Sequence, residues 1–283
     1  MKNRSNIFGL EHLAASQWGM FTVAQAQILG FRRNQISRMV DAARVESMCY
    51  GVYRFVAGSE PVHADLKAAW LSVFPKETAA ERLSKRPYDA VVASGTASVA
   101  LGAGDFHMSP YTFIASSRRQ TARADMRFLR CSLEDCDVVM LDGLPTTTPE
   151  RTVFDLLRLD EDPSLVDGFM REVVQNRAHS FDFERLASLL GPIASRYGFP
   201  KGGAAFAADL VSRNAVDVLM CRAGAELKGV LNGISDSDAF EPETKKAGRY
   251  LFDALRDLGL DFEAEEMRET PSERNSTLAG EGS

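Results

Sequence analysis

A short segment near the N-terminus carries side chains of the types that read DNA. Arginine can donate two hydrogen bonds to guanine, asparagine and glutamine can pair in the same way with adenine, and serine can reach a phosphate. The spacing of Ile36, Met39 and Val40 predicts an amphipathic helix over Arg32–Asp41. Its polar face can also be merely solvated, so the neighbouring elements must decide between the two interpretations. The residues of this face are Arg32, Arg33, Asn34, Gln35, Ser37 and Arg38.

Two further helices are expected directly before this segment. Apolar residues three and four positions apart predict a helix over Ile7–Gln17. Thr22 and Gln25 have the spacing of a capping box, which predicts that a second helix begins at Val23. That helix is expected to end at Gly30, a residue suited to the left-handed conformation of a helix C-terminus. The result is a helix, a glycine turn and a basic helix.

A β-hairpin is predicted after the basic helix. Two short β-prone runs, Arg44–Met48 and Gly51–Val56, lie on either side of a turn. A hairpin in this position is typical of the wing of a winged helix-turn-helix domain, whose basic residues contact phosphates. The order of these elements favours DNA binding over a merely solvated face. The predicted DNA-binding residues are Thr22, Gln25, Arg32, Arg33, Asn34, Gln35, Ser37, Arg38, Arg44, Tyr50 and Arg54.

The charge distribution also sets the N-terminal part apart. The chain of 283 residues has a formal net charge of −6, which by itself argues against a nucleic-acid-binding protein. Residues 1–60, however, hold seven Lys and Arg residues against four Asp and Glu residues, a charge of +3, which leaves −9 for the remainder. A basic N-terminal part on an acidic body predicts a domain boundary near Gly58–Val62.

Several classes of protein are not expected. The sequence has no run of about 18 apolar residues, so it predicts no membrane-spanning helix. Glu11 and His12 stand where a signal peptide would be apolar, so export is not expected. The four cysteines include no CxxC pair, and the four histidines have no metal-ligand spacing. We therefore expect a cytoplasmic protein with reduced thiols, no metal and no cofactor.

The acidic remainder predicts an α+β fold, in which a small, mainly antiparallel sheet is packed by several helices. A polar connector is expected over Ala79–Pro87. The predicted strands are Asp89–Ser94, Tyr111–Ala115, Met126–Cys131 and Val138–Leu141. The predicted helices are His63–Phe74, Thr96–Gly104, Pro149–Leu159, Pro163–Asn176, Phe183–Tyr197, Gly203–Arg213, Val216–Leu231 and Lys245–Leu258.

Four segments are therefore expected along the chain. Residues 1–60 form the winged helix-turn-helix domain, and residues 61–200 form the α+β domain. A helical extension covers residues 201–269. The last residues, 270–283, are small and polar and cannot bury enough apolar surface to become ordered.

The sharpest motif of the body lies at residues 141–157, LDGLPTTTPERTVFDLL. It predicts a strand, a glycine turn and a helix that Thr148 caps, with Pro149 at its first position. Arg151 and Asp155 are four residues apart and can pair on one helix face.

This motif resembles the D-G-L/I-P-V/T-T-x-x-x-R-T-L/V-x-D-L-L segment of the AbiEi family, in which Thr147, Arg151 and Asp155 are the matching residues. Residues 13–26, 30–33 and 50–55 resemble the N-terminal winged helix of the same family. Ala43, Gly95 and Gly102 depart from the family pattern. The two glycines replace histidines, so no role of those histidines carries over.

The resemblance implies a non-enzymatic antitoxin of a bacterial type IV toxin–antitoxin system. Such a protein binds inverted repeats of double-stranded DNA in its own promoter, as a monomer or a dimer. It represses an operon shared with a nucleotidyltransferase-like toxin, and the domain at 61–200 counteracts that toxin without a required direct contact. The alternative is a ligand-responsive winged-helix regulator with no toxin partner.

Two other features leave weaker alternatives. Asp217, Glu226 and Lys228 have the residue types of a metal-dependent nuclease, but the segment reads as a helix where that chemistry expects a strand. A second basic run is either a solvated hairpin or a positive patch for an acidic partner. Its residues are Arg118, Arg119, Arg123, Arg127 and Arg130.

Overall fold

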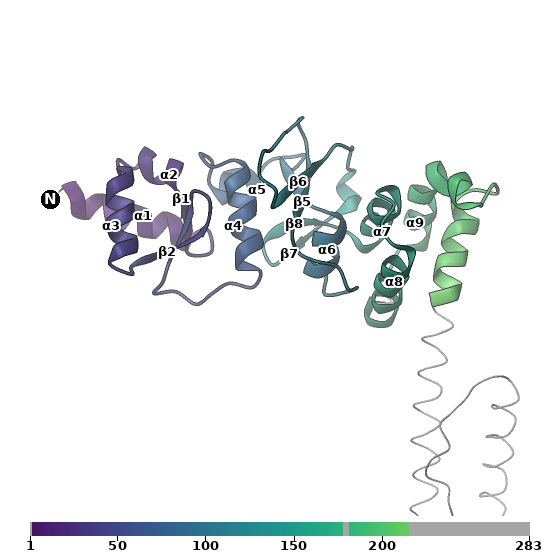
Figure 1. Ribbon diagram of the computed structural model, residues 1–283. Helices are drawn as coiled ribbons and strands as arrows, with labels where there is room; N and C mark the ends of the chain where they lie inside the picture. Colours follow the sequence, from purple (N-terminus) through teal and green to yellow (C-terminus); the bar gives the residue numbers. More distant parts are fainter. Residues whose placement is uncertain (1, 178–180, 215–283) are drawn as a thin grey trace, which may run out of the picture. The chain divides into compact units, whose positions relative to one another are not determined.

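The computed structural model describes residues 2–177 and 181–214 (Figure 1). They belong to one compact unit, Met1–Asp217, whereas a second unit, Val218–Ser283, lies outside the described residues. The predicted helices at 216–231 and 245–258, most of the 201–269 extension, the 270–283 tail and the three nuclease-type residues therefore lie outside them too. The described part confirms the α+β class.

Three helices and a small three-stranded sheet form the N-terminal part, and its helices and hairpin follow the order that the sequence predicts. The sheet has the strand order β1-β3-β2, and both pairings are antiparallel. The elements are α1 (Lys2–Ala15), β1 (Met20–Thr22), α2 (Val23–Ile28), α3 (Arg33–Asp41), β2 (Val45–Cys49) and β3 (Val52–Phe55).

Local signals account for the helix ends. The Thr22 hydroxyl accepts a hydrogen bond from the Gln25 amide at 3.0 Å, and the Gln25 side chain accepts one from the Thr22 amide at 2.9 Å. This is the predicted capping box at the start of α2. Gly30 follows α2 with φ +86°, a conformation in which a side chain would be strained.

The β1-β3-β2 sheet is covered on both faces. Phe21 and Val45 pack with α1, α2 and α3 in one apolar cluster. Met20 and Val52 point the other way and pack with Trp70 of α4 (Ala64–Val73). Figure 1 shows α3 and α4 on opposite sides of this sheet. The core therefore continues across the predicted boundary near residues 58–62.

The second sheet is mixed, which corrects the mainly antiparallel arrangement expected from the sequence. Its order is β6-β5-β4-β8-β7, where the β4–β5 and β7–β8 pairings are antiparallel and the β4–β8 and β5–β6 pairings are parallel. The connection 116–125 is long enough to carry the chain back for a parallel pairing. The strands are β4 (Ala90–Val92), β5 (Tyr111–Ala115), β6 (Met126–Leu129), β7 (Val138–Leu141) and β8 (Leu144–Thr147).

Three strands or α-helices were not predicted. The first is β1, whose residues Met20–Thr22 were expected only as a connection that ends in a helix cap. The polar connector contains the helix α5 (Ala79–Leu83), which Thr78 and Glu81 begin with a capping box. The motif segment contains β8, whose four residues are all buried and so show no alternation of polar and apolar residues.

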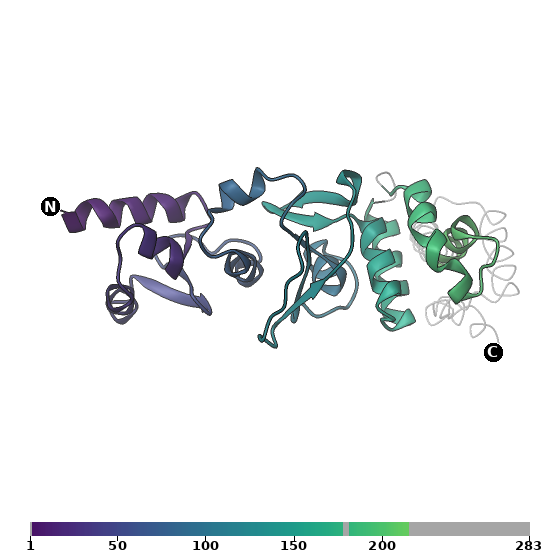
Figure 2. The same ribbon diagram turned by 90° about the horizontal axis from the view of Figure 1, so that it is seen from above.

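The helices after β8 build a second apolar core, whereas Ala97 of the earlier helix α6 belongs to the first. The last of these helices begins at Gly203. The residue there must be glycine because a Cβ would lie 1.9 Å from the carbonyl oxygen of Ala187, so any side chain would force the helices apart. In Figures 1 and 2, α7, α8 and α9 lie beside the five-stranded sheet and α6, on the side away from the N-terminal part. The helices are α6 (Ser94–Ala100), α7 (Pro149–Arg158), α8 (Pro163–Arg177), α9 (Phe183–Leu190), the 3₁₀ helix Gly191–Tyr197 and helical residues 203–214.

Candidate nucleic-acid interface

The outer face of α3 brings most of the predicted DNA-binding residues together. Ile36 and Met39 are buried, at 2% and 7% exposure, and anchor the helix to the N-terminal core. The side chains at positions 33, 34, 37 and 38 are exposed. Because residues four apart share a helix face, these four side chains form one solvent-exposed stripe along α3. Arg32, directly before the helix, is exposed as well.

The stripe is basic. Among the described residues, Arg32, Arg33 and Arg38 form no ion pair within 4.0 Å. The helix N-terminus adds a partial positive charge beside Arg32 and Arg33. Gln35 is half-buried, and its side-chain oxygen accepts a 2.8 Å hydrogen bond from the Arg32 amide. The Gln35 side-chain oxygen thus caps the start of the helix, and only its side-chain nitrogen remains for a ligand.

Thr22 and Gln25 do not belong to this surface, which corrects their predicted contact with DNA. They are 0% and 2% exposed. The Thr22 hydroxyl donates to the carbonyl of Pro75, and the Gln25 side-chain nitrogen donates to the carbonyl of Glu77 at 2.7 Å. The segment after α4 therefore covers the start of α2.

Arg54 is also removed from the predicted set. It lies on the face of β3 that packs toward α4, where it is 8% exposed. Its Nε donates to Glu46 at 2.7 Å and its Nη1 to the carbonyl of Gly58 at 3.0 Å. Its burial and these contacts hold the Arg54 guanidinium away from the surface that a phosphate of DNA would reach.

The two remaining predicted residues are exposed but lie apart from the stripe. Arg44 forms an ion pair with Glu11 at 3.3 Å, and both side chains are about half exposed. Tyr50 is 85% exposed at the turn between β2 and β3. The Arg44 amide donates to the carbonyl of Met39 in α3 at 2.9 Å, but within the described part of the chain neither side chain forms a hydrogen bond or ion pair with α3.

The residues of the body motif form an internal brace. Thr147, Arg151 and Asp155 are buried. Arg151 lies 3.3 Å from Asp155, as predicted, and 3.1 Å from Asp137, which the sequence did not single out. Burial raises the pKa of Asp155, and the positive charge of Arg151 opposes that shift. The motif thus holds α7 to the chain before β7 rather than forming a surface.

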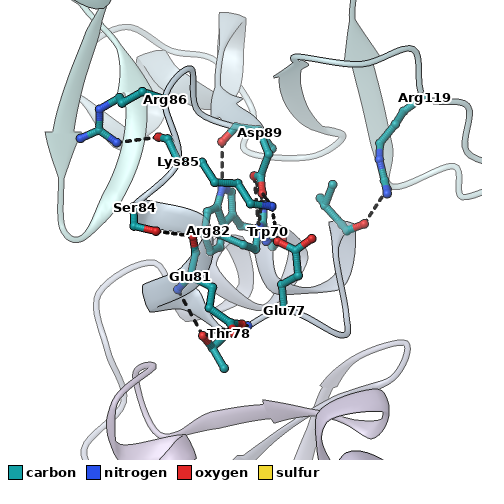
Figure 3. Close-up of polar contacts among 12 residues, drawn as sticks. Trp70, Glu77, Thr78, Glu81, Arg82, Ser84, Lys85, Arg86, Asp89 and Arg119 are labelled. Carbon is teal, nitrogen blue, oxygen red and sulfur yellow. Dashed lines mark hydrogen bonds and ion pairs between the residues drawn. The ribbon is translucent and has the colours of Figure 1, made fainter.

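A second buried ion pair was missed by sequence reasoning (Figure 3). Arg82 of α5 is fully buried, donates to Asp89 at 2.8 Å and lies 3.3 Å from the centre of the Trp70 ring. Burial lowers the pKa of Arg82, against the opposing effect of Asp89. The capping box at Thr78 was the signal that could have revealed α5.

The second basic run is not a hairpin, because β5 and β6 are parallel. Two of its arginines are half-buried and are held by contacts within the protein: Arg119 stacks over Phe74, and Arg123 pairs with Asp125 at 2.6 Å. The exposed members are Arg118, Arg127 and Arg130.

The described residues contain neither a cluster of metal-ligating side chains nor a helix that could span a membrane. Within residues 2–177 and 181–214, no three His, Cys, Asp or Glu side chains are grouped to hold a metal ion. In the same part of the chain no helix has the length and apolar character that a membrane span requires.

Comparison with known proteins finds a distant structural likeness. No protein-family model matches the chain, and no curated protein matches it. The crystal structure of the Rv2827c protein from Mycobacterium tuberculosis is similar over 72% of this chain and 74% of that chain, with 16% sequence identity and a TM-score of 0.44. A likeness of this size carries no argument, so the candidate interface rests on the geometry of this chain alone.

Proposed function

We propose that the chain is a DNA-binding protein and that α3 is the recognition helix of a winged helix-turn-helix domain. The observation that carries the proposal is the exposed stripe of α3, in which the cations have no acidic partner among the described residues. The order α1-β1-α2-α3-β2-β3 and the sheet order β1-β3-β2 support it, because that fold places its third helix in the major groove.

The proposed binding site is an inverted repeat in the promoter of the chain's own operon. One helix with two arginines and one asparagine reaches only a few base pairs, so useful specificity requires two half-sites. Two copies of the chain, bound as monomers or as a dimer, would occupy them and repress transcription.

The sequence motifs extend the proposal to a cytoplasmic, non-enzymatic antitoxin without a cofactor. The AbiEi resemblance of the 141–157 motif and of the N-terminal part supports this assignment. The body would counteract a nucleotidyltransferase-like toxin encoded in the same operon, without a required direct contact.

One observation favours a second candidate, a regulator that senses a small ligand. An open pocket of about 360 Å³ in the helical part is lined by six apolar or aromatic residues and by the charged residues Asp160, Glu161, Asp209 and Arg213, a lining that suits a small ligand with both apolar and polar groups. The gene neighbourhood separates the two candidates, because a nucleotidyltransferase gene downstream favours the antitoxin. The apolar lining residues are Leu157, Pro163, Val166, Tyr197, Phe199 and Phe206.

Arg33→Ala and Arg38→Ala are each expected to weaken binding to the upstream DNA about 10-fold or more, because each removes a donor to a base or a phosphate. Gel-shift titrations at two salt concentrations measure the effect. A lost phosphate contact also lowers the salt dependence by about one unit of slope. Arg86→Ala is the matched control, since Arg86 is an exposed arginine of the body. Wild-type affinity in both α3 variants would refute the assignment of α3.

The double variant Arg33→Ala/Arg38→Ala is expected to separate repression from neutralisation. Because the α3 stripe is confined to the N-terminal part, the variant should lose repression of a promoter reporter but still protect cells from the downstream toxin. Growth with induced toxin and reporter output measure the two effects in the same strain. Failure of the wild-type chain to protect the cells would remove the antitoxin part of the proposal and leave the DNA-binding part standing.

A further inference from the structure

Two buried glutamines form the centre of a polar junction inside the protein. Gln17, just after α1, and Gln25, in α2, are 1% and 2% exposed. The Gln17 side-chain nitrogen donates to Gln25 Oε1 at 2.7 Å and to the carbonyl of Met20 at 2.8 Å. The two amides thus fix each other and the strand that leads into α2.

The same amides bind the backbone of the segment 75–79, which belongs to the acidic body. Gln25 Nε2 donates to the carbonyl of Glu77 at 2.7 Å, and Gln17 Oε1 accepts from the amide of Ala79 at 3.2 Å. The hydroxyl of Thr22 adds a third bond, to the carbonyl of Pro75. Backbone groups buried without partners are costly, so the N-terminal part and the body each complete the hydrogen bonding of the other.

The body fixes the segment 75–79 from its other side (Figure 3). The carboxylate of Glu77 pairs with Lys85, whose amine also lies 3.4 Å from Asp89. Asp89 in turn holds the fully buried Arg82. A continuous chain of polar contacts therefore runs from α2 through the segment 75–79 to the start of β4.

An aromatic contact lies beside the polar one. Trp18 meets Trp70 edge to face, with ring centres 6.0 Å apart. Lys67 lies 5.6 Å above the Trp18 ring and donates to the carbonyl of Val62 at 2.7 Å. Burial lowers the pKa of Lys67. Because the chain has two tryptophans in all, its intrinsic fluorescence reports on this junction.

We propose that Gln17 and Gln25 are positioning residues for DNA recognition, an inference that rests on the proposed function. α3 follows α2 after a short glycine turn, and Ala26, Phe31 and Ile36 pack both helices into one cluster, so α3 moves with α2. The junction therefore holds α3 in its DNA-competent position relative to the body. A change in the body that opens the junction lowers DNA affinity, and by thermodynamic reciprocity DNA binding closes it.

Gln25→Met tests the proposal in the full-length chain, because Met has a similar length but neither donates to Glu77 nor accepts from Thr22. We expect DNA affinity to fall about 10-fold, since only molecules with a formed junction bind well. Tryptophan emission of the free variant should shift to longer wavelength, and saturating DNA should reverse the shift. Gln27→Met is the matched control, because Gln27 is an exposed residue of the same helix.

Two further measurements separate positioning from simple loss of fold. Thermal unfolding shows whether Gln25→Met remains folded. Lys85→Met acts on the far side of the segment 75–79 at a half-buried site, and it should lower DNA affinity in the same direction by about 2-fold. Hydrogen exchange of the Ala79 amide reports whether the junction has opened.

The outcomes distinguish this inference from the proposed function. Wild-type DNA affinity in a Gln25→Met variant whose Ala79 amide exchanges faster would overturn the inference and leave DNA binding by α3 intact. Absence of DNA binding by the wild-type chain would overturn the proposed function, and the inference with it. Reduced affinity together with emission that DNA restores would establish the coupling.

Discussion

Arg82→Met is expected to lower the free energy of unfolding by about 3 kcal/mol, because it leaves the carboxylate of Asp89 buried without its main partner. The Arg82 side chain donates to Asp89 through Nε and Nη2 at 3.0 and 2.8 Å, and through Nη1 to the carbonyl of Trp70. Lys85 remains 3.4 Å from Asp89, so the loss stays near the lower end of the range for broken buried pairs. Urea unfolding of the full-length chain measures the change.

Arg86→Met is the control for this prediction. Arg86 is exposed and only four residues away. Its contacts are solvent-exposed bonds to the carbonyls of Leu83 and Lys85 and stacking on Tyr88, so the same substitution there should cost no more than about 1 kcal/mol. The double variant Arg82→Met/Asp89→Leu should recover part of the loss, since it removes both buried charges. An unfolding midpoint of Arg82→Met equal to that of the wild type would show that the pair does not stabilise the fold.

Asp137→Ala should lower the free energy of unfolding by about 3–5 kcal/mol, because it leaves two arginines without their shared carboxylate. Asp137 is 1% exposed. Its Oδ2 lies 3.1 Å from Arg151 Nη1, and its Oδ1 lies 2.6 Å from Arg185 Nη2. The same side chain accepts from the amide of Glu134 at 3.0 Å and so orders the turn before β7. Urea unfolding again provides the measurement.

Asp135→Ala is the matched control, because Asp135 lies two residues away in the same 3₁₀ turn and is exposed. It should unfold close to the wild-type midpoint. If the two variants lost the same amount of stability, the brace between Asp137 and the two arginines would contribute nothing measurable.

The brace also affects how variants of the body motif are interpreted. Thr147, Arg151 and Asp155 carry the proposed resemblance to the AbiEi motif, yet all three are buried. A substitution of Arg151 that abolishes neutralisation of a toxin therefore has to be compared with its effect on unfolding before a direct role is assigned. Residues exposed on the body are better candidates for such a role.

The N-terminal helices and the hairpin were predictable from the sequence because their signals are local, whereas β1 was not. The capping box of Thr22 and Gln25 and the glycine turn at Gly30 act within three or four residues. The helical period of Ile36 and Met39 identified which face of α3 is buried. In the body, the pairing of Arg151 with Asp155 followed from their separation of one helical turn.

The pairing of the strands in the body was not predictable in this way. Parallel pairing of β5 with β6 and of β4 with β8 depends on where the chain returns after long connections. β8 escaped notice because both of its faces are buried, which removes the alternation that marks a half-exposed strand. Neither the parallel pairing nor the burial of both faces of β8 can be inferred from a short stretch of the sequence.

The sequence by itself determined the basic stripe of α3, since amphipathic period and residue type are enough to define one helix face. Only the tertiary structure decided which polar residues remain available to a ligand. Thr22 and Gln25 bind backbone atoms 53 and 52 residues away, and Arg54 is buried on the α4 side of its sheet. Burial is a property of contacts between distant parts of the chain, whereas a cap or a helical stripe depends on neighbours alone.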